Sequence, residues 1–328
     1  MTAAPLSVLD NVRLNNGSEG VKNFYRDLLV KNSDKAMELI NEQNLQFRTL
    51  FLLRGELSAS AYRKLLNPAY ERALQIMEEL NGNRTVKAEK ALRSGREDTA
   101  AVLKWMLHTG YAEDDADQEY GLLMDQTAAL LTRSFHDSSV LPEIADLIFE
   151  RHRNGRLIHE LVWAFFEARN PSSLILIAQR LLSPNAEDVQ LAKRLLCFIP
   201  SIMEDTAGTG SVLYLRAIQW LQENQPFLFY TGESLHLSNT PIHYAVSWVS
   251  KYLCRPVSPA DGQPLLVLNE YERNLSSQFE KLSEQQQMQL ADFSHMLFRR
   301  NSYQWNTWIR LPVHEQTVLA SQVMGGLS

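Results

Sequence analysis

The sequence has few cysteines, few glycines and no long apolar run. Two cysteines, Cys197 and Cys254, are too few for a disulfide framework or a cysteine-rich zinc site. The 14 glycines are a small number for 328 residues, which favours helices over turn-rich β structure. No apolar run reaches the roughly 18 residues that a membrane span needs, and the N-terminus does not have the pattern of a signal peptide. We therefore expect a cytoplasmic protein without membrane insertion.

Positive charge is also in short supply. The formal net charge is −6 at pH 7, whereas domains that bind nucleic acid are usually basic. This balance argues against nucleic acid as the partner. Hydrophobic residues make up 45% of the chain and charged residues 21%, which is the composition of a folded globular protein.

Motifs for catalysis and metal binding are missing. The sequence contains no HExxH, no phosphate-binding glycine loop and no GxSxG. The acidic run at 113–119 does not fit a calcium loop, because Tyr120 and Gln126 stand where that loop needs glycine and glutamate. We expect no metal, no cofactor and a non-enzymatic role. An active site assembled from distant residues would leave no local motif, so this alternative stays open.

The chain does contain a regular series of short helical segments between helix breakers, in residues 142–199. Three of these segments begin with a proline, namely Pro142, Pro171 and Pro184. Proline suits the first helical turn because it has no N–H and its φ is already helical. Asn170 and Ser183 precede two of these prolines and predict N-caps. Gly155 suits a helix end that turns left-handed.

The segments repeat after about 30 residues. Between the breakers, apolar residues follow helical spacing, as in the stripe Leu157, Leu161, Phe165 and Ala168. Shifted by 29 positions, Leu147-Ile148 aligns with Leu176-Ile177 and Arg151 with Arg180. Over about 142–199 the sequence thus resembles HEAT-like α-helical repeat proteins of the shorter-repeat kind. The resemblance implies an α-solenoid, in which helical hairpins stack on one another.

The rest of the chain also favours helices, and no strand pattern of any length is seen. Pro68 is expected either to kink one helix or to split it at Asn67. The expected helices outside 142–199 cover 20–31, 33–53, 58–80, 97–109, 116–135, 212–224, 241–254, 264–283, 284–300 and 312–324. Loops are expected at 203–211, 226–240 and 255–264, with a short extended piece within 226–240.

These patterns predict an all-α fold, an α-solenoid-like array of antiparallel helical hairpins that is partly irregular. The expected organisation is a flexible N-terminal lead (1–18), a helical-repeat domain (19–254), a loop or boundary (255–264) and a C-terminal helical cap (265–328). The boundary is placed at 255–264 because that stretch holds three prolines and a glycine.

A basic run is the first candidate binding site. It consists of Arg84, Lys87, Lys90, Arg93 and Arg96. With Glu89 the run carries a net charge of +4 over 84–96, and could contact an acidic partner. Residues three apart drift around a helix, so these charges form no single stripe. A solvated helix face is the plainer interpretation.

An aromatic group near the C-terminus is the second candidate. Tyr303, Trp305 and Trp308 are residue types that are frequent in binding hot spots. The same residues would also suit a cap that seals the last layer of the core, which is the interpretation we favour.

Three functions are compatible with these patterns. The first, which we favour, is a scaffold for protein–protein interaction, whose partner could present an acidic surface. The second is a nucleic-acid-binding or DNA-repair helical-repeat protein that uses the basic run. The third is an enzyme accessory or assembly factor, since the resemblance extends to such proteins. We expect the determinants of function in the loops or in the basic run, rather than in the regular hairpins.

Overall fold

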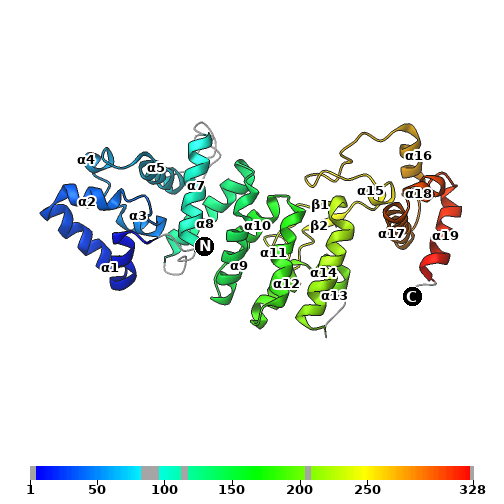
Figure 1. The fold of residues 1–328 in the computed structure, drawn as a ribbon, viewed down its shortest axis with the longest axis horizontal. Coiled ribbons are helices and arrows are strands. Elements are labelled where there is room, and N and C mark those ends of the chain that lie inside the picture. The colour runs from blue at the N-terminus through cyan, green and yellow to red at the C-terminus, as the bar shows by residue number, and fades with distance from the viewer. Residues whose placement is uncertain (1–4, 83–95, 112–116, 204–207, 326–328) are drawn as a thin grey trace. The chain divides into compact units, whose positions relative to one another are not determined.

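A computed structural model describes residues 5–82, 96–111, 117–203 and 208–325 (Figure 1). These residues are mostly helical, as the sequence predicted. The chain divides into two compact units, Met1–Ala168 and Arg169–Ser328. Within the described ranges, no helix combines the length and apolar character that crossing a bilayer requires.

Unit 1 consists of helices only in its described part. Its elements are α1 (Val8–Lys31), α2 (Ser33–Ile40), α3 (Phe47–Leu53), α4 (Ser60–Arg63), α5 (Pro68–Gly82), α7 (Arg96–Gly110), α8 (Gln118–Ala129), the π-helical η3 (Leu130–Ser134), the 3-10 turn η4 (Ser138–Val140), α9 (Leu141–Arg153) and α10 (His159–Glu167). The helix α3 is buried along its whole length and packs against α1 and α7, so it forms the centre of this unit.

A buried carboxylate fastens α1 to α3. Asp10 accepts hydrogen bonds from the hydroxyls of Ser7 and Thr49, each at 2.5 Å, and from the backbone N–H of Gln46 at 3.0 Å. The guanidinium of Arg13 donates to Thr49 and Gln46, each at 2.7 Å. All these groups come from α1, α3 and their N-caps, so the two helices are held in one register by hydrogen bonds that are largely shielded from water.

The N-terminal part of unit 1 is more helical, and more divided, than expected. The lead predicted over 1–18 is helical from Val8, because the side chain of Ser7 caps α1. The single helix expected over 33–53 is two helices, α2 and α3. Of the two outcomes expected at Pro68, a kink or a split, the structure has the split: α5 begins at Pro68, and Asn67 caps it by accepting from the N–H of Tyr70 at 2.9 Å.

The first predicted hairpin is present as α9 and α10, which pack against each other. Gly155 in the connection has a φ of 65°, which confirms the predicted left-handed helix end. Leu161 and Phe165 are buried. The prediction was wrong for Leu157, which is largely exposed because α10 begins only at His159.

The described part of unit 2 contains helices and a small two-stranded sheet. Its elements are the 3-10 turn η5 (Pro171–Ser173), α11 (Leu174–Ala178), the 3-10 turn η6 (Gln179–Leu182), α12 (Ala186–Leu195), α13 (Pro200–Met203), α14 (Gly210–Asn224), the 3-10 turn η7 (Gln225–Phe227), β1 (Leu228–Tyr230), β2 (Tyr244–Val246), α15 (Trp248–Tyr252), α16 (Glu270–Phe279), α17 (Glu284–Arg300), α18 (Ser302–Trp308) and α19 (Val313–Gly325).

The second predicted hairpin begins unit 2, whereas the first ends unit 1. Asn170 caps η5 by accepting from the N–H of Ser172, as expected. Ser183 is not the cap of the following helix, since Asn185 takes that place and accepts from the N–H of Glu187. Stacking of the two hairpins into an array stays a prediction.

The two-stranded sheet departs from the expected all-α fold. β1 pairs antiparallel with β2, with Phe229 opposite Ala245. The helix expected over 241–254 is therefore β2 followed by the short α15. Gly262 lies against the ring of Phe229, where a Cβ would come within 2.9 Å of that ring. The loop 255–264 thus covers β1, a long-range contact that sequence periodicity does not report.

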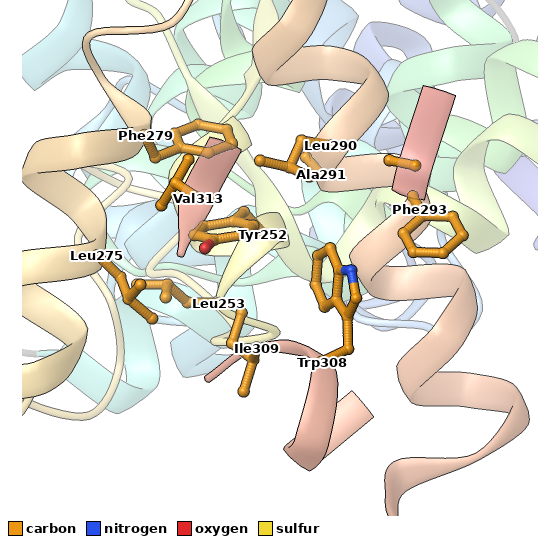
Figure 2. Packing of buried hydrophobic residues seen from close by; sticks show 11 residues of the cluster. Tyr252, Leu253, Leu275, Phe279, Leu290, Ala291, Phe293, Trp308, Ile309 and Val313 are labelled. Carbon is orange, nitrogen blue, oxygen red and sulfur yellow. The ribbon is translucent and has the colours of Figure 1, made fainter. Parts of the chain in front are cut away.

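The C-terminal core of unit 2 is built around Tyr252, which lies among buried side chains of α16, α17, α18 and α19 (Figure 2). Its ring stacks on Phe279 with centroids 4.6 Å apart. Its hydroxyl donates to the buried side chain of Gln316 at 2.7 Å. The helix α17 packs against α15, α18 and α19. This core fixes the position of α17 relative to α15, and hence the cavity described next.

Candidate functional site

The predicted basic run lies outside the described residues, apart from the backbone of Arg96, which begins α7. Arg84, Lys87, Lys90 and Arg93 therefore stay a prediction.

The three residues of the predicted aromatic group differ in how far they are buried. Trp308 lies in the C-terminal core (Figure 2), with its ring 5.3 Å from that of Phe293. The indole N–H of Trp305 donates to the buried hydroxyl of Ser294 at 2.8 Å. Tyr303 is largely exposed. The two tryptophans thus contribute to the core, and Tyr303 alone presents its ring to solvent.

A cavity in unit 2 brings together ionisable side chains that the sequence did not suggest. Its volume is about 470 Å³. Three helices supply the lining, which consists of Glu223 from α14, Lys251 from α15, and Asp292, His295, Met296, Arg299 and Arg300 from α17. On α17 these residues recur at spacings of three and four, so they lie on one face of the helix.

The innermost charge of the cavity is the ammonium of Lys251. This side chain is only 2% exposed, and its Nζ donates to Asp292 at 2.5 Å and to Asn224 at 2.6 Å. Asp292 is 42% exposed, so its carboxylate meets both the buried lysine and water. A buried ammonium persists only with such partners, because desolvation of an isolated charge is costly.

His295 lies half-buried between these charges. Burial lowers its pKa, and the positive charges of Lys251 and Arg299 lower it further, while Glu223 and Asp292 oppose the shift. Its ring meets the ring of Phe227 edge-on at 5.1 Å. A lowered pKa favours the neutral imidazole, which can both donate and accept a hydrogen bond.

Arg299 and Arg300 lie at the exposed end of the cavity. Among the residues that the structure describes, neither guanidinium makes a hydrogen bond or an ion pair. Their position in the last turn of α17 suits the helix macrodipole, but that interaction uses the charge and not the N–H donors. The donors of both side chains are thus available to a ligand.

A second feature of unit 2 is an exposed apolar segment, Leu265–Val267. Leu265 is 63% exposed, Leu266 64% and Val267 94%. The backbone is held before the segment by a bridge between Val257 and Pro264 and by the N–H of Leu265, which donates to the carbonyl of Pro256 at 2.9 Å. After the segment, Leu268 packs against the C-terminal core. Scattered apolar residues are ordinary on a surface, but three in succession on a fixed backbone are not.

The same segment corrects the expected helix 264–283. The helix α16 begins only at Glu270, because Asn269 and Glu272 form a capping box there. Leu268 packs against the C-terminal core while Leu265–Val267 point away from it.

Sequence reasoning missed the cavity because its seven lining residues come from three helices. The helical spacing of charged residues on 284–300 was the one signal for it. Among the described residues, no group of three or more histidine, cysteine, aspartate or glutamate side chains is arranged to hold a metal ion.

Comparison of the chain with protein-family models, with curated proteins and with solved structures found no match in any of the three.

Proposed function

We propose that the protein is a non-enzymatic helical scaffold that binds another protein, and that Leu265–Val267 form part of the contact. The exposed succession of three apolar side chains on a fixed backbone carries this proposal. Each such side chain would contribute roughly 1.5–3 kcal/mol to association if a partner buried it fully. Because the backbone is already ordered, little conformational entropy is lost when the partner binds.

The proposal includes a repeat architecture for part of the chain. We take the pair α9–α10, and the helices from η5 to α12, as two HEAT-like repeats of an α-solenoid in a cytoplasmic protein. Helical hairpins that bury their cores on one another leave their loops free for recognition. An acidic surface on the partner would suit the basic run 84–96. Arginine and lysine side chains there would contribute mainly to the association rate.

Affinity capture from native cells tests this function. The variant carries Leu266→Asp and Val267→Asp, which place two charges in the proposed contact. Val30→Asp is the matched control, because Val30 is 88% exposed and lies in the other unit. We expect a partner that wild type and the control retain and the double variant loses. A partner that all three retain equally would contradict the assignment of the contact.

Binding to duplex DNA separates the scaffold from the nucleic-acid alternative. We expect no salt-sensitive binding of the full chain to duplex DNA at physiological ionic strength. Tight, salt-sensitive binding would refute the scaffold proposal and favour the basic run as a phosphate contact.

A further inference from the structure

We propose that the cavity between α14, α15 and α17 binds a small phosphorylated organic molecule that carries hydroxyl groups. Arg299 and Arg300 would hold the phosphate, and the carboxylates of Glu223 and Asp292 would accept hydrogen bonds from the hydroxyls. This inference goes beyond the scaffold function, since it concerns a different part of unit 2 and a different class of ligand.

The charge of the lining favours an anion. Three cationic side chains and two carboxylates surround the cavity, which leaves one net positive charge while His295 is neutral. Lys251 is already neutralised by Asp292 at 2.5 Å, so the excess lies with the two arginines. Guanidinium groups match phosphate oxygens with pairs of parallel N–H donors, and such charge-assisted bonds are about twice as strong as neutral ones.

The size of the cavity favours an organic molecule over a free ion. At about 470 Å³ it falls within the range of roughly 300–1,000 Å³ that is usual for small-molecule sites. Met296 supplies an apolar part of the wall, and the ring of Phe227 packs edge-on against His295. Inorganic phosphate would fill only the arginine end.

The carboxylates explain why hydroxyl groups are expected. Glu223 accepts one weak hydrogen bond from Gln219 at 3.2 Å, and Asp292 is partly exposed beside Lys251. Both therefore keep lone pairs that face the cavity. A second anionic group near them would be repelled, whereas hydroxyl donors would be bound. The ligand thus carries its negative charge at one end only.

Isothermal titration calorimetry with three probes tests the site on the full chain. Ribose 5-phosphate should bind more tightly than inorganic phosphate, and ribose alone should not bind. The double variant Arg299→Gln, Arg300→Gln should bind ribose 5-phosphate roughly ten- to a hundredfold more weakly, as expected for the loss of hydrogen bonds to a charged group. Arg310→Gln is the matched control, since Arg310 is an exposed arginine of the same unit outside the cavity. It should change the affinity less than twofold.

A second measurement locates the ligand. A bound phosphate should raise the pKa of His295, because the anion stabilises the imidazolium that Lys251 and Arg299 disfavour. Nuclear magnetic resonance of the histidine Cε1–H signals follows this shift, and His295→Gln assigns the signal. The proposal is overturned if wild type binds none of the probes, if ribose 5-phosphate binds no better than inorganic phosphate, if the control variant loses as much affinity as the double variant, or if the His295 signal does not respond.

Discussion

Replacing Asp292 with asparagine should destabilise unit 2 more than replacing Lys251 with methionine, although the first change is the more conservative in shape. Asp292→Asn leaves the ammonium of Lys251, which is 2% exposed, without an anionic partner. Removing one partner of a buried pair costs about 3–5 kcal/mol, and the lower end applies because Asp292 is itself partly hydrated.

Lys251→Met leaves a carboxylate that water can reach, because Asp292 is 42% exposed. Its main cost is the lost hydrogen bond to the side chain of Asn224, which is buried and would have one oxygen unsatisfied. An unsatisfied buried acceptor costs roughly 1–3 kcal/mol. The unequal exposure of the two partners therefore sets the order of the two variants.

Chemical denaturation, followed by far-ultraviolet circular dichroism, compares the two variants with wild type. Hydrogen–deuterium exchange in peptides from α15 and α17 attributes the loss to unit 2. Lys281→Met, at an exposed lysine of the same unit, serves as control and should stay within about 0.5 kcal/mol of wild type. If Lys251→Met costs as much as Asp292→Asn, burial of the lysine charge does not decide the energy of the pair.

Three further predictions concern other parts of the fold. Phe165→Ala removes a buried ring and should cost about 3–5 kcal/mol in chemical denaturation, whereas Leu157→Ala, at an exposed position, should cost almost nothing; equal losses would show that the stripe is not a core face. Burial lowers the pKa of His243 to about 4, from its ordinary 6.5. The unfolded chain therefore binds this proton at a higher pH than the folded chain does. The contribution of His243 to the free energy of unfolding is full above about pH 6.5, and it falls by roughly 3 kcal/mol as the pH drops to 4. His243→Gln should reduce this fall in the free energy of unfolding between pH 6.5 and 4, measured by denaturation at successive pH values. An unchanged fall would assign it to other groups. Gly262→Ala combines a φ of 73° with a Cβ 2.9 Å from the ring of Phe229, so thermal denaturation should show a loss of about 1–3 kcal/mol; an unchanged Tm would mean that the loop can move away from β1.

The breakers and the local spacing of apolar residues determined most of the helices. Proline at the first turn, asparagine before it and glycine at a helix end act on neighbouring residues. Asn170 and Gly155 therefore have the predicted roles, and the helix pattern divides at Pro68. The helix expected over 284–300 has the bounds of α17, and the structure shows a capping box of Ser283 and Gln286 at its start. These interactions are local, and a sequence displays them directly.

Predictions failed where distant parts of the chain decide the structure. The strand at 244–246 forms because β1 offers hydrogen-bonding partners earlier in the chain, with Tyr230 opposite Tyr244 and Leu228 opposite Val246. A short apolar run alone does not distinguish a strand from a helix. Leu157 has helical spacing, yet it lies before the start of α10 and has no core to enter.

The sequence by itself determined that the chain is mostly helical and where several helices begin and end, among them α7, α14, α17 and α19. It also identified buried positions such as Leu161 and Phe165. Those properties depend on capping, on φ preferences and on a period of 3.6 residues. Only the tertiary structure decided that Lys251 is buried against Asp292, that Arg299 and Arg300 keep free donors beside it, and that Leu265–Val267 point outward. Charge pairing and exposure are set by which helices pack together, and that packing brings together residues as far apart as 223 and 300.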